Sequence, residues 1–67
     1  MTDNTCEVQH VSRHCCFKLI EDETETRYVP IRNDGMHVQC LVLNGKFYGN
    51  TVHFPCKMLV EVKGYIQ

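Results

Sequence analysis

The stretch "NDGMHVQCLVLNG" (residues 33–45) decides the fold, because it places an apolar segment between two turn signals. Asn, Asp and Gly tolerate the positive φ angles of tight hairpin turns, so "NDG" (33–35) and "NG" (44–45) each predict a turn. The segment between them, residues 36–43, is apolar on both faces in its second half, which is typical of a buried strand. Two turns around one strand predict an antiparallel sheet.

Outward from this strand, short segments rich in β-forming residues continue in both directions. Pro30 lacks an N–H, so we expect it at a sheet edge or at a bulge. Gly49 is expected at a bulge or at a close approach of two backbones. The sequence therefore predicts a mostly β fold, a small five-stranded antiparallel barrel or a curved sheet. The expected strands are residues 14–21, 26–32, 36–43, 46–54 and 57–66.

The N-terminal part of the chain carries no firm pattern. We expect residues 1–9 to be loose. A helical spacing of apolar residues at Val8, Val11 and Cys15 leaves a short N-terminal helix over residues 5–14 as the alternative.

Length and composition indicate one small globular domain, residues 1–67, with 43% hydrophobic and 22% charged residues. A chain this short buries only roughly 60% of its unfolded surface, so it needs a staple or a partner subunit. The second half of the central strand is apolar on both sides, with Leu41 and Leu43 on one and Cys40 and Val42 on the other. Strand edges of this kind leave surface to be covered, which predicts a homodimer.

Cysteine usage and hydropathy favour the cytoplasm. The chain has five cysteines, an odd number, and Cys15 and Cys16 are neighbours, so we expect reduced thiols rather than a disulfide scaffold. No apolar run approaches the ~20 residues of a membrane span. The start of the chain lacks the basic and hydrophobic regions of a secretory signal. We expect no membrane association.

Two His-x-x-Cys pairs, "HVQC" (37–40) and "HFPC" (53–56), raise the question of a zinc site. Their arrangement resembles the paired knuckles of zinc ribbons, and the resemblance implies His37, Cys40, His53 and Cys56 as ligands. However, residues three apart on a strand point to opposite faces, which separates His37 from Cys40. We expect no metal or other cofactor, with zinc at these four residues as the alternative.

A second set of metal-ligating residues lies near the N-terminus. Cys6, His10 and His14 share a face if that stretch is helical, and Cys15 or Cys16 would complete a set of four.

The stretch "LVLNGKFYGNTV" (41–52) resembles the central hairpin of Sm-like proteins, in which an apolar strand leads into Asn-Gly and then into a strand containing Gly. The resemblance implies a small barrel and a route to RNA or to ring-like assembly. Cations interleaved with stacking aromatics would carry such nucleic-acid binding. The net charge of −1 shows no dense basic face, so this function remains the alternative. Its candidate residues are Lys46, Phe47, Tyr48, Lys57, Lys63 and Tyr65.

The clearest charge cluster is acidic and lies in "EDETET" (21–26), which suits an exposed loop. We interpret Glu21, Asp22, Glu23 and Glu25 as a docking site for a basic surface of a larger protein. The alternative is a solvated loop that keeps the protein soluble.

Catalysis is not expected. The chain has no nucleophile elbow, phosphate-binding Gly loop or metalloprotease motif, and it has little room for a substrate pocket beside its core. The favoured function is therefore a small non-enzymatic regulatory binding protein, an adaptor or an inhibitor, by analogy with small viral accessory proteins.

Overall fold

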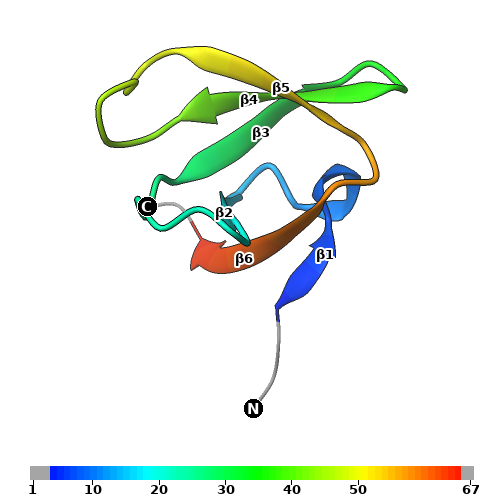
Figure 1. The fold of residues 1–67 in the computed structure, drawn as a ribbon. Helices are drawn as coiled ribbons and strands as arrows, with labels where there is room; N and C mark the ends of the chain where they lie inside the picture. The colour runs from blue at the N-terminus through cyan, green and yellow to red at the C-terminus, as the bar shows by residue number, and fades with distance from the viewer. Residues whose placement is uncertain (1–3, 66–67) are drawn as a thin grey trace.

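The computed structural model describes residues 4–65 and shows six antiparallel strands in one sheet (Figure 1). The strand order is β1-β6-β2-β3-β4-β5, so β1 and β5 are the two edges and do not pair with each other. The elements are β1 (Thr5–Glu7), the 3-10 turn η1 (Val8–His10), β2 (Cys15–Leu19), β3 (Tyr28–Asn33), β4 (His37–Val42), β5 (Thr51–Pro55) and β6 (Leu59–Tyr65).

The mostly β prediction is confirmed, but the five-stranded barrel is not, because the sheet has six strands and stays open. The sheet folds over between β2 and β3, which are joined by the single register pair Phe17↔Tyr28. Strands β3, β4 and β5 therefore lie above β2, β6 and β1 in Figure 1.

The N-terminal part is better ordered than its sequence predicts. Strand β1 pairs with β6, with Cys6 opposite Val60, so the expectation of a loose segment is wrong for residues 5–9. The alternative helix over 5–14 is also wrong, since only the three residues of η1 are helical there. The N–H of Val8 donates to the Met58 carbonyl at 2.8 Å, so contacts with a distant strand replace helical bonds. Residues 1–3 lie outside the described part of the chain.

The β3–β4 turn confirms the prediction from "NDG". Asn33 Oδ1 accepts the Gly35 N–H at 2.8 Å, and Asp34 Oδ1 accepts the His37 N–H at 2.8 Å. Gly35 has φ 99°, a conformation that favours glycine. The turn is built from its own side chains.

The β4–β5 connection differs from the prediction. Strand β5 begins at Thr51 instead of residue 46, and residues 43–50 form a loop in place of a two-residue turn. The Asn44 side chain bonds to a different loop: its Oδ1 accepts the Arg27 N–H at 2.8 Å, and its Nδ2 donates to the Glu25 carbonyl at 3.3 Å. Gly49 lies in this loop with φ 90°, not at a strand bulge. The Asn44 amide therefore holds two loops together.

Two register shifts bend the sheet. One lies between Pro30 and Arg32, which confirms the bulge predicted at the proline. The other lies in the β2–β6 pairing, where Cys16 faces Gly64 and Phe17 faces Val62. This shift interrupts the regular alternation of side chains between the two faces that was expected for the last strand. The predicted final residue of that strand, 66, lies outside the described residues.

The core is small and lies inside the fold of the sheet. Phe17 and Val60 are fully buried, and they pack with η1 and the inner face of β4. The Phe17 ring stacks on Tyr28 at 5.6 Å between centroids, and Phe54 meets Tyr28 edge-on at 5.2 Å. These three aromatic rings extend the core toward the side where the two halves of the folded sheet are not joined.

Candidate protein-binding surface

The acidic loop, defined here as residues 20–27 between β2 and β3, is folded onto itself. Asp22 Oδ1 accepts the Thr24 hydroxyl at 2.6 Å and the Thr24 N–H at 2.9 Å. These bonds stabilise the charged form of the carboxyl group and lower the pKa of Asp22. The bond from the Thr24 hydroxyl has the larger effect on that pKa. Asp22 therefore stabilises the conformation of the loop and also contributes negative charge to it.

Glu25 is held by ion pairs. Its carboxylate lies 3.2 Å from the Arg27 guanidinium and 3.9 Å from the Lys18 ammonium, and Lys18 is buried. Glu25 also has φ 61°, a left-handed conformation that costs a non-glycine residue roughly 1–2 kcal/mol. Glu21 and Glu23 are exposed and form no ion pair within residues 4–65. Asp22 likewise forms no ion pair within residues 4–65, so these three residues carry the uncompensated charge of the loop.

The acidic loop is also anchored from outside. Besides the two Asn44 bonds, the Leu43 N–H donates to the Arg27 carbonyl at 2.8 Å. Asn44 and Lys18 contact the acidic loop but were not among the predicted site residues. Asn44 was interpreted as a turn residue, and no local pattern marks Lys18 as the counterion of Glu25.

Next to this loop lies an apolar hollow of about 570 Å³. The side chains of Ile20 and Leu59 in it are 46% and 55% exposed. Its lining residues are Leu19, Ile20, Glu21, Asp22, Met58 and Leu59. Two of the four predicted partner-binding acids therefore border an apolar surface.

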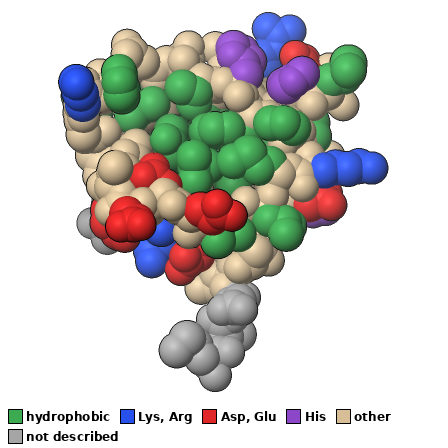
Figure 2. Space-filling model, viewed as in Figure 1, with side chains coloured by type: hydrophobic (Ala, Val, Ile, Leu, Met, Phe, Trp, Pro, Cys, Tyr) green, Lys and Arg blue, Asp and Glu red, His purple; other side chains and the backbone are tan. Residues whose placement is uncertain are grey.

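The apolar surface continues from the hollow toward β5. Tyr28 directly follows the acidic loop at the start of β3. The pKa of Tyr28 is raised first by burial and then by the negative charge of Asp22. Phe54 packs against Tyr28, and both contact the core. Figure 2 shows apolar side chains in a continuous patch across this side, with acidic side chains along its lower border. We call this surface the apolar face, and its members are Leu19, Ile20, Tyr28, Phe54, Met58 and Leu59.

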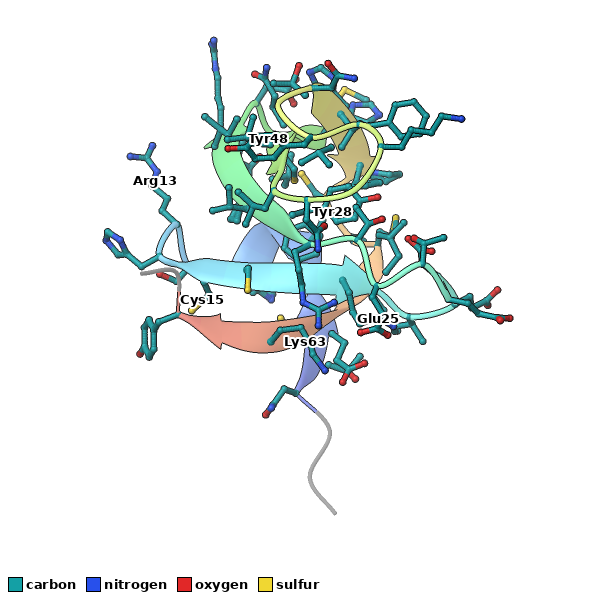
Figure 3. The ribbon with its side chains drawn as sticks, turned by 90° about the vertical axis from the view of Figure 1, so that its left-hand side faces the viewer. Arg13, Cys15, Glu25, Tyr28, Tyr48 and Lys63 are labelled. Carbon is teal, nitrogen blue, oxygen red and sulfur yellow. The ribbon has the colours of Figure 1, made fainter. Side chains whose placement is uncertain are left out.

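The candidate nucleic-acid residues are not brought together. Lys46, Phe47 and Tyr48 are exposed in the β4–β5 loop, whereas Lys57 lies at the other end of β5. Figure 3 shows Tyr48 and Lys63 on opposite halves of the molecule. Lys63 is paired with Glu61 at 3.4 Å. Tyr65 is 80% exposed at the end of β6.

The hairpin behind the Sm-like resemblance is formed by β4 and β5, but its connection is a longer loop than the pattern implies. The Gly that the pattern places in the second strand, Gly49, lies in the β4–β5 loop.

The alternative zinc ligands are divided between two environments. His37 and His53 are exposed, whereas Cys40 and Cys56 are buried in the core. Cys56 Sγ donates to Asn33 Oδ1 at 3.4 Å. Across residues 4–65, no group of three or more His, Cys, Asp or Glu side chains is placed to hold a metal ion. The geometry does not fit a zinc ribbon.

The N-terminal metal set is separated in the same way. Cys6 belongs to β1, His10 ends η1, and His14 is exposed before β2, so no helical face unites them.

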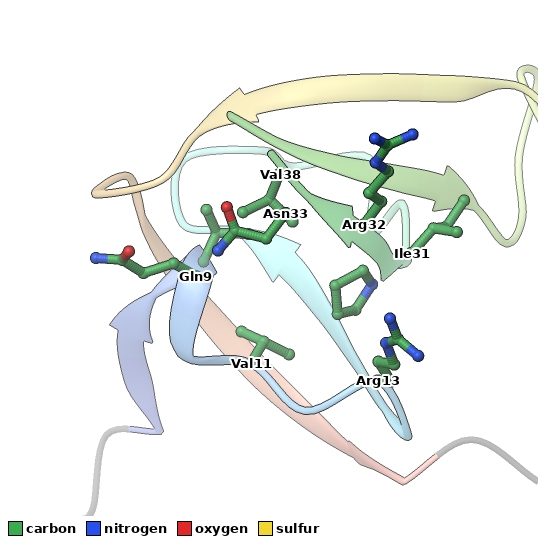
Figure 4. A pocket seen from close by; sticks show the side chains of 9 residues that line it. Gln9, Val11, Arg13, Ile31, Arg32, Asn33 and Val38 are labelled. Carbon is green, nitrogen blue, oxygen red and sulfur yellow. The ribbon is translucent and has the colours of Figure 1, made fainter. Parts of the chain in front are cut away.

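Two further hollows lie elsewhere. One of about 300 Å³ lies between η1 and β3, and its lining includes Val11, Pro30, Arg13 and Arg32 (Figure 4). Another of about 250 Å³ holds His37 and His53 with Asp34. The pKa of Asp34 is lowered, first by the hydrogen bond from the His37 N–H.

Two of the thiols are less acidic than a free cysteine. Burial raises the pKa of Cys40 to about 12, and burial followed by the charge of Glu7 raises that of Cys6. A thiol with a raised pKa is protonated at neutral pH and reacts slowly.

In residues 4–65 no helix is long and apolar enough to cross a membrane. Comparisons with protein-family models, curated proteins and solved structures found no match for this chain.

Proposed function

We propose that the protein is a small non-enzymatic regulatory binding protein that docks on a larger protein through the apolar face and the acidic loop beside it. The observation that supports this most directly is the hollow of about 570 Å³, in which apolar side chains and carboxylates meet. Exposed apolar patches with a polar border are typical of protein interaction sites. The partner presents apolar side chains flanked by basic residues.

The two parts of the surface have different roles. Burial of Ile20 and Leu59 supplies affinity, because both are about half exposed in the free protein. The charges of Glu21 and Glu23 steer the encounter and select a basic partner. The hydrogen bonds of Asp22 and the ion pairs of Glu25 hold the loop in one shape, so less conformational entropy is lost on binding.

A photo-crosslinking experiment tests the proposal. A photoreactive amino acid replaces Ile20 or Leu59 on the apolar face, or Ile31 as a matched control on another surface, where exposure is a similar 41%. We expect one dominant crosslinked protein from positions 20 and 59 and not from position 31. Equal crosslinking from all three positions would contradict the proposal.

The identified partner then allows a kinetic test of the charges. The double change Glu21→Gln with Glu23→Gln slows association several-fold and flattens its salt dependence, because steering charges act mainly on the association rate. Glu61→Gln is the matched control, since Glu61 is paired with Lys63 at 3.4 Å. Unchanged association with poorer solubility would leave only the solvated-loop alternative.

The homodimer stays a prediction. Cys40 and Val42 are buried in the core, whereas Leu41 on the opposite side of β4 is half-buried. Sedimentation at tens of micromolar tests it, and a monomer there would argue against a dimer of ordinary affinity.

A further inference from the structure

The hollow of about 300 Å³ between η1 and β3 differs in charge from the hollow beside the acidic loop. Its lining includes Arg13 and Arg32 and no aspartate or glutamate. The hollow beside the acidic loop has the opposite composition, with Glu21 and Asp22 and no basic residue. The two hollows share no lining residue, so they are separate sites.

The buried part of this lining is apolar. Val8 and Val38 belong to the core, and Val11 and Pro30 are buried as well. Ile31 adds an apolar side chain at the surface, where it is 41% exposed. A volume of about 300 Å³ is at the lower limit for small-molecule sites, so the hollow suits a compact apolar group such as a single ring.

Local backbone features position the two arginines. Arg13 lies in the turn before β2, where the Cys15 N–H donates to the Ser12 carbonyl at 3.0 Å. Arg32 follows the register shift at Pro30, and a bulge of this kind changes the direction of the side chains around it. Figure 4 shows both arginine side chains on the side of the hollow away from η1.

The two positive charges of this hollow are not compensated. Neither Arg13 nor Arg32 forms an ion pair within residues 4–65. The acids nearby have other hydrogen-bond partners: Asp34, which shares the adjacent hollow with Arg32, accepts N–H groups of its own turn, and Glu7 accepts the Gln9 amide. Both arginine side chains are exposed, so they can turn toward an anion without breaking an ion pair.

We propose that this hollow binds a small organic phosphate, with the phosphate held by Arg13 and Arg32 and the apolar group on the buried part of the lining. A phosphate monoester carries about two negative charges at neutral pH, which matches the two arginines. Guanidinium groups bind phosphate oxygens through pairs of parallel hydrogen bonds. The inference is independent of the proposed function, because the hollow is a different one and the ligand is not a protein.

A titration of the full chain with phenyl phosphate, followed by NMR, tests the proposal. We expect saturable binding, with the largest amide shifts at lining residues such as Val8, Gln9 and Val38. Inorganic phosphate lacks the apolar group and benzyl alcohol lacks the charge, so each is expected to bind at least about tenfold more weakly. Phenylacetate keeps the ring but carries one negative charge, and it is expected to bind several-fold more weakly than phenyl phosphate.

Variants of the protein give a second readout. Arg13→Gln and Arg32→Gln each remove one charged donor group, and each is expected to weaken phenyl phosphate binding by about tenfold. Lys46→Gln is the matched control, because it removes one exposed positive charge from the β4–β5 loop, outside the hollow. We expect it to change the affinity by less than about twofold, since salt screens a distant exposed charge. Unchanged amide signals elsewhere in each variant confirm that the fold is kept.

Several results would overturn the proposal. They are the absence of saturable binding of phenyl phosphate, equal binding of inorganic phosphate or phenylacetate, and an equal loss of affinity in Lys46→Gln. Amide shifts centred on Leu19, Ile20 and Leu59 would place the ligand in the other hollow and would also contradict it. None of these results bears on protein docking, which the crosslinking experiment decides independently.

Discussion

The β3–β4 turn and the β4–β5 loop start from similar sequences, Asn-Asp-Gly and Asn-Gly, and fold by different means. In the first, Asn33 and Asp34 bond to N–H groups no more than three residues away. In the second, Asn44 bonds to Arg27 and Glu25, in a different loop. In this chain the Asn-Gly pair at 44–45 does not form a tight turn, because the Asn44 amide bonds to the backbone of another loop.

The difference matters for the proposed binding surface. The β3–β4 turn is held mainly by its own side chains, although Asn33 Oδ1 also accepts the distant Cys56 thiol at 3.4 Å, so a change there acts mostly on its own hairpin. The β4–β5 loop holds the acidic loop in place, and a change at Asn44 reaches the surface where Glu21 and Glu23 lie. Substitutions in the two connections distinguish a turn held by local bonds from one held by distant bonds.

The largest effect is expected for Asn44→Ala. It removes two hydrogen bonds and leaves the Arg27 N–H without its partner, so the free energy of unfolding falls by about 1–2 kcal/mol in a urea titration. Hydrogen exchange of the Arg27 amide becomes faster. Asn50→Ala is the matched control, because the Asn50 side chain forms no hydrogen bond within residues 4–65, and it should change stability little. Equal losses in both variants would contradict the non-local role of Asn44.

Replacing the glycine in either connection by alanine is expected to lower stability by a smaller amount, which is the same for both. Gly35 has φ 99° and Gly49 has φ 90°, and an added Cβ would meet no atom within 4 Å at either position. Alanine there is opposed by backbone conformation alone, at a cost of about 1 kcal/mol. Thermal unfolding of Gly35→Ala and Gly49→Ala measures it. A loss at one glycine and none at the other would mean that the two backbones differ in strain.

The smallest effect is a difference in pH dependence. The pKa of Asp34 is lowered, first by the His37 N–H and then by the Met36 N–H. Its contribution to stability is therefore present above the unfolded-state pKa, near 3.9, and is lost as pH falls through the folded-state pKa. Asp34→Asn flattens the acid limb of a stability–pH curve. Asn44→Ala shifts the whole curve without changing its shape, because the lost bonds involve no titratable group.

How far the fold follows from sequence depends on the range of the interactions. Strand β4 and the "NDG" turn could be predicted, since local alternation and turn chemistry determine them. The bulge at Pro30 followed from the missing N–H. Strand β1 could not be predicted, because Cys6 and its neighbours gain order only by pairing with β6, far away in the chain.

The candidate site shows the same limit. Sequence identified the four acids as a cluster, but it could not tell that Glu25 is paired with Lys18 and Arg27 while Glu21 and Glu23 are not. The apolar face was not predicted either, since Leu19 and Leu59 come together only through the pairing of β2 with the distant strand β6.

Because Cys40 is buried, the rate at which a thiol reagent modifies it reports how often the sheet opens. Its side chain is fully buried on β4, and its pKa of about 12 leaves almost no thiolate at neutral pH. A thiol reagent can modify Cys40 only after β4 separates from its neighbours, so the labelling rate counts those separations. Cys15 and Cys16 are half-buried and react without such an event. Mass spectrometry of partly labelled chains would therefore measure how often β4 separates from its neighbouring strands, without any introduced probe.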